Sequence, residues 1–208
     1  MPRLHSLSPA DAPVGTLIDG KYRVERLLSR GGAGAVFVAR HVHLGTEVAL
    51  KLLHDHARDG GDASARDLRT RRFLREARLA AQLTHPNLVQ ILDCGLVDDV
   101  PYLVMELIPG TDLRARLAAA PLTLVETCAL IDGIAAGLTV AHVAGIVHRD
   151  LKPDNVVLDT RATPPRPRVV DFGLATLTPT AARDASGSSL PPMAGTPAYL
   201  APTGRRRR

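Results

Sequence analysis

Three polar side chains stand close together in the stretch GIVHRDLKPDNVVLD, residues 145–159. Asp150, Lys152 and Asn155 occupy positions i, i+2 and i+5 of a segment that reads as a loop between a helix and a strand. Such a loop can present a carboxylate, an ammonium group and an amide to one point. A carboxylate can take a hydroxyl proton, a cation can contact a migrating phosphate, and an amide oxygen can bind magnesium. The stretch therefore favours phosphoryl transfer.

A glutamate interrupts an apolar helical stripe in the first half of the chain. Residues 71–84 predict a helix, and Glu76 falls inside its apolar face. That face consists of Phe73, Ala77, Ala80 and Leu83. Because a buried carboxylate costs several kcal/mol unless it is paired, the position predicts a cationic partner for Glu76.

Two further stretches have the residue types that contact phosphates. SRGGAGAV, residues 29–36, matches the spacing GxGxxGxV except that Ser29 takes the first place. Glycines let backbone N–H groups approach phosphates, and the strand that follows argues against a dinucleotide fingerprint, which needs a helix there. In VALKLL, Ala49 and Lys51 are two apart and face the same side of a strand. A small Ala leaves room for a flat base, although Lys51 alone would read as an exposed strand lysine.

The pattern of the whole chain predicts a small sheet with one helix, followed by a helical part that carries short strands. The polar stretch 54–70 reads as a loop, residues 127–145 have helical periodicity, and the boundary between the parts falls near 108–112. Alternation and glycine turns predict strands at 22–28, 35–42, 47–53, 87–97, 101–107, 155–159 and 168–172.

Composition narrows the class of protein. Of 208 residues, 45% are hydrophobic and 23% charged, which is ordinary for a soluble domain, and the absence of Trp predicts an aliphatic core. Four of the five surplus positive charges come from residues 205–208, so the charge does not indicate a specific nucleic-acid partner. Cys94 and Cys128 stand far apart and no His has a third ligand at metal spacing, which disfavours a disulfide framework and a zinc site.

The longest uncharged stretch, 133–147, is too short to span a bilayer, and the N-terminus lacks the apolar core of a signal peptide. No membrane segment is therefore expected in this chain, and a cytoplasmic location is expected.

HRDLKPDN at 148–155 and VVDFG at 169–173, in this order, resemble the signature of the eukaryotic-type serine/threonine protein kinase family, in a bacterial style. The resemblance covers about residues 20–202. It implies an α+β, two-lobe kinase fold, with an N-terminal antiparallel sheet plus helix C and an incomplete, mainly helical C-terminal lobe. It implies an N-lobe at 20–108 and a partial C-lobe at 109–202, and composition predicts a disordered segment at 1–19 and a basic tail at 203–208.

The resemblance implies a role for each polar residue of the motifs. Asp150 would be the catalytic base, and Asn155 and Asp171 would bind Mg²⁺ that bridges the ATP phosphates. Lys51 would pair with Glu76, as a strand lysine and a helix C glutamate do in this family. The implied catalytic residues are Asp150, Lys152, Asn155, Lys51 and Glu76.

The resemblance also implies an ATP site. Met105 would be the gatekeeper residue, the backbones of Glu106 and Ile108 would bond adenine, and Asp112 would contact the ribose. The residues implied to bind ATP are Leu28, Ser29, Gly31, Gly32, Gly34, Val36, Ala49, Lys51, Met105, Glu106, Ile108 and Asp112.

Lys152 and GTPAYLAP at 195–202 resemble Ser/Thr kinases rather than tyrosine kinases. The implied function is transfer of the ATP γ-phosphate to Ser/Thr hydroxyls of proteins, with self-association for trans-autophosphorylation. One alternative is an ATP-binding or regulatory fragment without catalysis. Another is a nucleic-acid binder that depends on residues 205–208.

The resemblance ends where the family has a glutamate and this chain has Thr203. Helices that follow in relatives would cover the long helix, so Cys128, Ile131 and Leu138 are expected to be exposed. Every group that handles ATP, magnesium and the proton is expected to be present but weakly supported. Activity is expected to be low, because phosphoryl transfer depends on positioning.

Autophosphorylation is predicted within residues 176–196, because Arg149 precedes Asp150 and kinases with this arrangement use that arginine to capture a phosphate. The candidate acceptors are Thr176, Thr178, Thr180, Ser186, Ser188 and Ser189. Phosphopeptide mapping after incubation with Mg·ATP is expected to find phosphate in this segment. An active sample in which the segment is unmodified would contradict the prediction.

Overall fold

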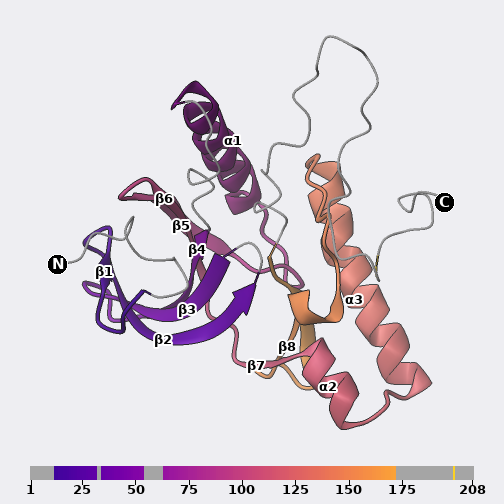
Figure 1. Ribbon diagram of the computed structural model, residues 1–208. Helices are drawn as coiled ribbons and strands as arrows, with labels where there is room; N and C mark the ends of the chain where they lie inside the picture. Colours follow the sequence, from indigo (N-terminus) through magenta and orange to yellow (C-terminus); the bar gives the residue numbers. More distant parts are fainter. Residues whose placement is uncertain (1–11, 32–33, 54–62, 172–198, 200–208) are drawn as a thin grey trace, which may run out of the picture. The chain divides into compact units, whose positions relative to one another are not determined.

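The computed structural model describes residues 12–31, 34–53, 63–171 and 199 (Figure 1). The chain forms two compact units, one of residues 1–82 and 90–107 and one of residues 83–89 and 108–208. The chain leaves the first unit at Leu107. The assignment of 83–89 to the second unit has no counterpart in the sequence prediction.

The first unit contains a six-stranded antiparallel sheet with the strand order β1-β2-β3-β4-β6-β5. The predicted strand at 87–97 begins only at Ile91. The strands are β1 (Leu17–Ile18), β2 (Tyr22–Gly31), β3 (Gly34–His41), β4 (Glu47–Leu53), β5 (Ile91–Val97) and β6 (Val100–Glu106).

The strand register divides the side chains of this sheet between two faces. Residues that pair across neighbouring strands share a face. One face carries the core of the unit, which includes Phe37, Leu50, Leu52 and Val104. The opposite face carries Val36, Val38, Ala49, Lys51, Leu103 and Met105, as the pairs of β4 with β3 and β6 require.

Helix α1 (Ala63–Ala81) packs against β5 and lies beside the sheet (Figure 1). Its stripe of Phe73, Ala77 and Ala80 is at most 3% exposed, which confirms the apolar face predicted by periodicity. The prediction of a loop is wrong for residues 63–70, which are helical. Five of these eight residues are Ala, Leu or Arg, which have high helix propensity, and Asp67 pairs with Arg71 one turn later at 2.8 Å.

The expectation of disorder over 1–19 is wrong for residues 12–19, and residues 1–11 lie outside the described part. Strand β1 pairs with β2, and Ile18 is fully buried in the core. The Tyr102 hydroxyl donates to Asp19 at 2.7 Å. A strand of two residues is too short to show an alternating pattern in the sequence.

The second unit contains two helices and a three-stranded antiparallel sheet with the order β7-β8-β9. The sequence analysis missed β7 and α2. Yet α2 begins at a recognisable cap, where the Asp112 carboxylate accepts from Ala115 N at 2.8 Å, and Thr123 and Glu126 form a capping box before α3. The elements are β7 (Gly110–Asp112), α2 (Leu113–Ala119), α3 (Leu124–Val143), the 3₁₀ turn η4 (Pro153–Asn155), β8 (Val156–Asp159) and β9 (Arg166–Val169).

Two glycines let α3 approach the segment 83–89 and β9 closely. A Cβ atom on Gly133 would lie 2.7 Å from Pro167 Cγ, and one on Gly137 would lie 2.8 Å from Leu88 Cδ2. Asn87 Nδ2 donates to Pro167 O at 2.8 Å in the same contact. The small core of the unit consists of Leu83, Leu88, Ala141 and Val169.

Much of α3 faces solvent. Cys128 is exposed and Ile131 is 58% exposed, as expected, but Leu138 packs against the small core, so that expectation is wrong. By length and composition α3 could also cross a membrane, which is weak evidence for a span. Its glycine face packs against Leu88 and Pro167, as the face of a helix in a globular unit does.

Replacing Gly137 by Ala is expected to lower the free energy of unfolding by about 1–3 kcal/mol, because the added methyl group would overpack the contact with Leu88. Helix propensity alone would raise it by about 1 kcal/mol. Urea unfolding measures the change. The exposed neighbour Ala136→Gly serves as the propensity control in the same helix, and stabilisation by G137A would contradict the close approach.

Candidate active site

The loop 148–155 brings Asp150, Lys152 and Asn155 together in the second unit. Lys152 Nζ lies 2.6 Å from Asp150 Oδ2. Asn155 Nδ2 donates to Asp150 O at 2.8 Å, and lies 3.4 Å from Asp150 Oδ2. The carboxylate and the ammonium group are each about a quarter exposed, which leaves both open to a ligand.

The β8–β9 hairpin places Asn155 and Asp171 at the same end of the sheet. Val156 pairs with Val169, and Val170 N donates to Asn155 O at 2.9 Å. Asp171 follows directly after Val170. Because this bond fixes the two strand ends side by side, Asn155 and Asp171 leave the hairpin from adjacent positions.

These two residues fit magnesium as a ligand pair. Mg²⁺ prefers oxygen ligands and takes one or two protein groups besides phosphate and water. The Asn155 amide nitrogen is directed at Asp150 O, so its oxygen points away from that bond. Among the described residues no group of three or more His, Cys, Asp or Glu side chains could hold a metal.

Two residues of the site have a left-handed backbone. Arg149 has φ 64° and Asp171 has φ 61°. Asp adopts this region more readily than Arg, for which it costs roughly 1–2 kcal/mol. Residues held in such conformations concentrate at functional sites, where the surrounding structure imposes them. Arg149 adjoins Asp150, and Asp171 is itself a predicted magnesium ligand.

His148 connects the loop to β9. It is 3% exposed. Its Nε2 lies 3.0 Å from Val170 O, and Asp150 N donates to its Nδ1 at 3.4 Å. A neutral ring that carries its proton on Nε2 satisfies both contacts. Burial lowers the pKa of His148, and the hydrogen bond to Val170 O opposes that shift.

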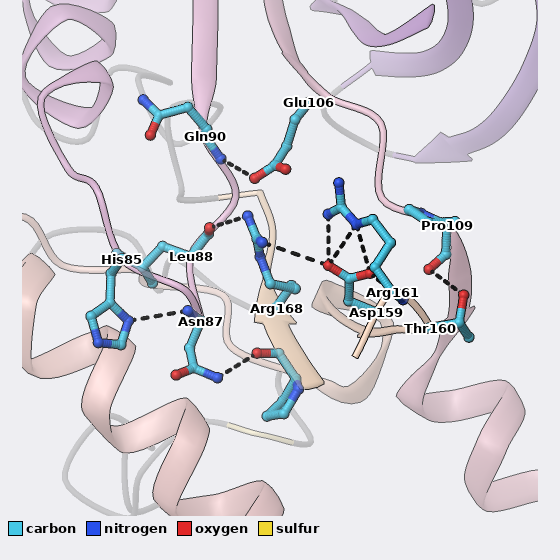
Figure 2. A network of polar contacts seen from close by, with 11 residues as sticks. His85, Asn87, Leu88, Gln90, Glu106, Pro109, Asp159, Thr160, Arg161 and Arg168 are labelled. Atoms are coloured by element: carbon cyan, nitrogen blue, oxygen red, sulfur yellow. Dashed lines mark hydrogen bonds and ion pairs between the residues drawn. The ribbon is translucent and has the colours of Figure 1, made fainter. Parts of the chain in front are cut away.

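A buried polar network holds β9 against the segment 83–89 (Figure 2). Arg168 Nη2 donates to Leu88 O at 2.7 Å, and its Nη1 lies 3.6 Å from Asp159 Oδ2. Arg161 also binds the Asp159 carboxylate, at 2.6 Å, and this hydrogen bond is the main cause that lowers the pKa of Asp159. The network fixes the strand that leads to Asp171.

In the first unit, four of the residues predicted to bind ATP lie on one face of the sheet: Val36, Ala49, Lys51 and Met105. Ala49 pairs with Met105, and Lys51 pairs with Val36, on the face opposite the core. Lys51 is only 4% exposed. The alternative of an exposed strand lysine is therefore wrong, and the aliphatic part of Lys51 is buried.

The glycine-rich stretch forms the end of the β2–β3 hairpin. Gly31 pairs with Gly34, and a bulge lies between Leu27 and Ser29, at Leu28. Gly34 has φ 143°, and a Cβ there would clash with Leu52 O, so no other residue fits. Gly32 lies outside the described residues.

Two hydrogen bonds to Gln90 hold the end of β6 at Glu106 (Figure 2). Glu106 N donates to Gln90 O at 3.0 Å, and Gln90 N donates to Glu106 Oε1 at 2.9 Å. Since the N–H of Glu106 is engaged, its backbone could offer adenine only the carbonyl oxygen. Ile108 and Asp112 belong to the second unit, and the Asp112 carboxylate caps α2.

Glu76 is half-buried on α1, beside the buried stripe. The contacts described for the first unit do not include an ion pair between Glu76 and Lys51, so this pair stays a prediction. Thr203 and the predicted phosphorylation segment 176–196 lie outside the described residues. Arg114, whose guanidinium binds Asp154 at 2.6 Å, was not predicted from the sequence; its place two residues after the helix cap Asp112 was the available signal.

Comparison with known proteins identifies relatives over most of the chain. A family model described as protein kinase domain matches residues 22–204. The chain is 40% identical over 192 residues to the serine/threonine-protein kinase pkn2 of Myxococcus xanthus, covering 92% of this chain and 22% of that protein. It is 38% identical over 165 residues to the serine/threonine-protein kinase PrkC of Bacillus subtilis, covering 78% of this chain and 24% of that protein.

A solved structure shares the fold. The PknI kinase domain of Mycobacterium tuberculosis superimposes with a TM-score of 0.66 at 32% sequence identity, covering 78% of this chain and 63% of that one. The chain spans about a quarter of the length of the two curated relatives, pkn2 and PrkC.

Stability is expected to fall as the pH drops through the ordinary histidine pKa of about 6.5, because the unfolded state then binds a proton that buried His148 excludes. Above that pH the effect is absent. Urea midpoints between about pH 7.5 and about pH 5.5 measure it. His148→Gln is expected to flatten the dependence and the exposed His43→Gln to retain it; equal slopes in wild type and H148Q would contradict the assignment.

Proposed function

Because this chain belongs to the protein kinase family, we propose that it transfers the γ-phosphoryl group of Mg·ATP to Ser or Thr hydroxyls of proteins, its own chain included, in the cytoplasm. The observation that carries the proposal is the arrangement of Asp150, Lys152 and Asn155 in one hydrogen-bonded loop. The match of residues 22–204 to the family supports it.

In the proposed reaction, Asp150 accepts the proton of the acceptor hydroxyl while the hydroxyl oxygen attacks the γ-phosphorus. The bond from that phosphorus to the bridging oxygen breaks, and ADP leaves. Lys152, 2.6 Å from Asp150 Oδ2, orients the carboxylate and contacts the transferred group. Bound Mg²⁺ would neutralise charge on the phosphates.

Asn155 and Asp171 are the proposed magnesium ligands, and their position at one end of the β8–β9 hairpin supports this. For Lys51 we propose a contact with the phosphates, supported by its burial on the face that also carries Ala49 and Met105. Acceptance of Ser and Thr rather than Tyr rests on Lys152 and on resemblance to relatives named serine/threonine kinases.

A second candidate is a chain that binds Mg·ATP without transfer. The exposed apolar face of α3 favours it, since a poorly supported catalytic loop positions its groups less well. ATP-dependent thermal stabilisation without any phosphate transfer is the result expected for this candidate.

Asp150→Ala is expected to lower phosphate transfer to a Ser/Thr protein acceptor by about 10²–10⁴-fold, because it removes the proposed base. Lys51→Met is expected to lower transfer and to weaken stabilisation by Mg·ATP. Radiolabel transfer and thermal melting measure the two effects.

Matched controls are Asp132→Asn on α3 and Lys21→Met on the first unit, which change the same charges elsewhere. Both are expected to leave transfer unchanged. Transfer that survives in D150A at the wild-type rate would overturn the proposed mechanism.

A further inference from the structure

Arg114 joins three segments of the second unit. Its Nε donates to Asp154 Oδ1 at 2.6 Å, and its Nη2 donates to Asp154 Oδ2 at 2.8 Å. The same Nη2 donates to the Tyr199 hydroxyl at 3.1 Å. Resting on the proposed function, we propose that Arg114 is a positioning residue that fixes the catalytic loop and Tyr199 to one another.

The base of Arg114 is held rigidly. Arg114 stands in the first turn of α2, directly after Leu113, which anchors the helix and is only 6% exposed. The cap residue Asp112 precedes both. Asp112 also pairs with Val157 in the sheet. Arg114 therefore follows β7, and the turn that contains Asp154 leads directly into β8. Both ends of the Arg114–Asp154 contact are attached to the same three-stranded sheet.

Asp154 occupies the turn between Lys152 and Asn155. Lys152 contacts the Asp150 carboxylate and Asn155 contacts its backbone, so a displaced Asp154 would displace both partners of Asp150. A bidentate arginine–carboxylate pair fixes orientation as well as distance. With side chains 52% and 41% exposed, the pair contributes little to stability, which leaves orientation as its effect.

Tyr199 makes the link observable. The chain has three Tyr residues. Tyr22 and Tyr102 are at most 4% exposed and donate to Asp93 and Asp19, whereas Tyr199 is 45% exposed. A spectroscopic label on tyrosine therefore gives one solvent-exposed signal, which Tyr199→Phe identifies by removing it.

The test labels the chain with 3-fluorotyrosine and records fluorine NMR spectra of wild type, R114M, R114K and R116M. R114M is expected to shift the Tyr199 resonance, to lower kcat for a protein acceptor about fivefold and to leave the Kd of Mg·ATP unchanged. R114K keeps the charge but loses the fork, so it is expected to resemble R114M more than wild type. R116M, in the same helix and bonded to Ala120 O, is expected to match wild type.

The outcomes separate this proposal from the proposed function. A Tyr199 resonance that R114M leaves in place overturns the link, whatever the activity. A shifted resonance with unchanged kcat in an active chain overturns the positioning role. A shifted resonance in a chain that neither binds Mg·ATP nor transfers phosphate supports the link and overturns the proposed function.

Discussion

The hydrogen bond from Val170 N to Asn155 O is the constraint on which the second unit's chemistry depends. It closes the β8–β9 hairpin at the end where Asn155 and Asp171 emerge. His148 reinforces the same point, since its ring contacts Val170 O and the Asp150 backbone. The carboxylates of Asp150 and Asp171 and the amide of Asn155 are thus related through one short stretch of backbone and through the side-chain contacts of His148 and Asn155.

Sequence patterns predicted the parts whose signal is local. Alternation located β2, β3, β4, β6, β8 and β9, and helical spacing located the buried face of α1. The patterns failed where stabilisation comes from distant residues or from single side chains. Residues 83–89 join the second unit through contacts with Pro167 and Gly137. No local sequence pattern predicts these contacts. The loop motif at 148–155 was predictable as a set of residue types, whereas the Arg114 contact needed the path of α2.

The polar contacts around the site divide by burial. Asp159 and Arg168 are largely withdrawn from water, so their contacts replace hydration and become costly to break from one side. Arg114 and Asp154 stay half-exposed, and their fork of hydrogen bonds costs little to form or lose. The buried network is suited to fixing a strand, and the exposed pair is suited to tuning a loop. The left-handed backbone of Arg149 shows that the fold tolerates local strain next to Asp150.

The segment Leu83–Val89 lies in sequence between α1 and β5, which belong to the first unit, yet it helps to build the second unit's core. Its partners Ala141 and Val169 come much later in the chain, so this core has a high contact order and forms only after distant residues meet. A fragment that ended at Leu107 would carry Leu83 and Leu88 without the residues that bury them. Neither unit can therefore be isolated by one cut of the chain.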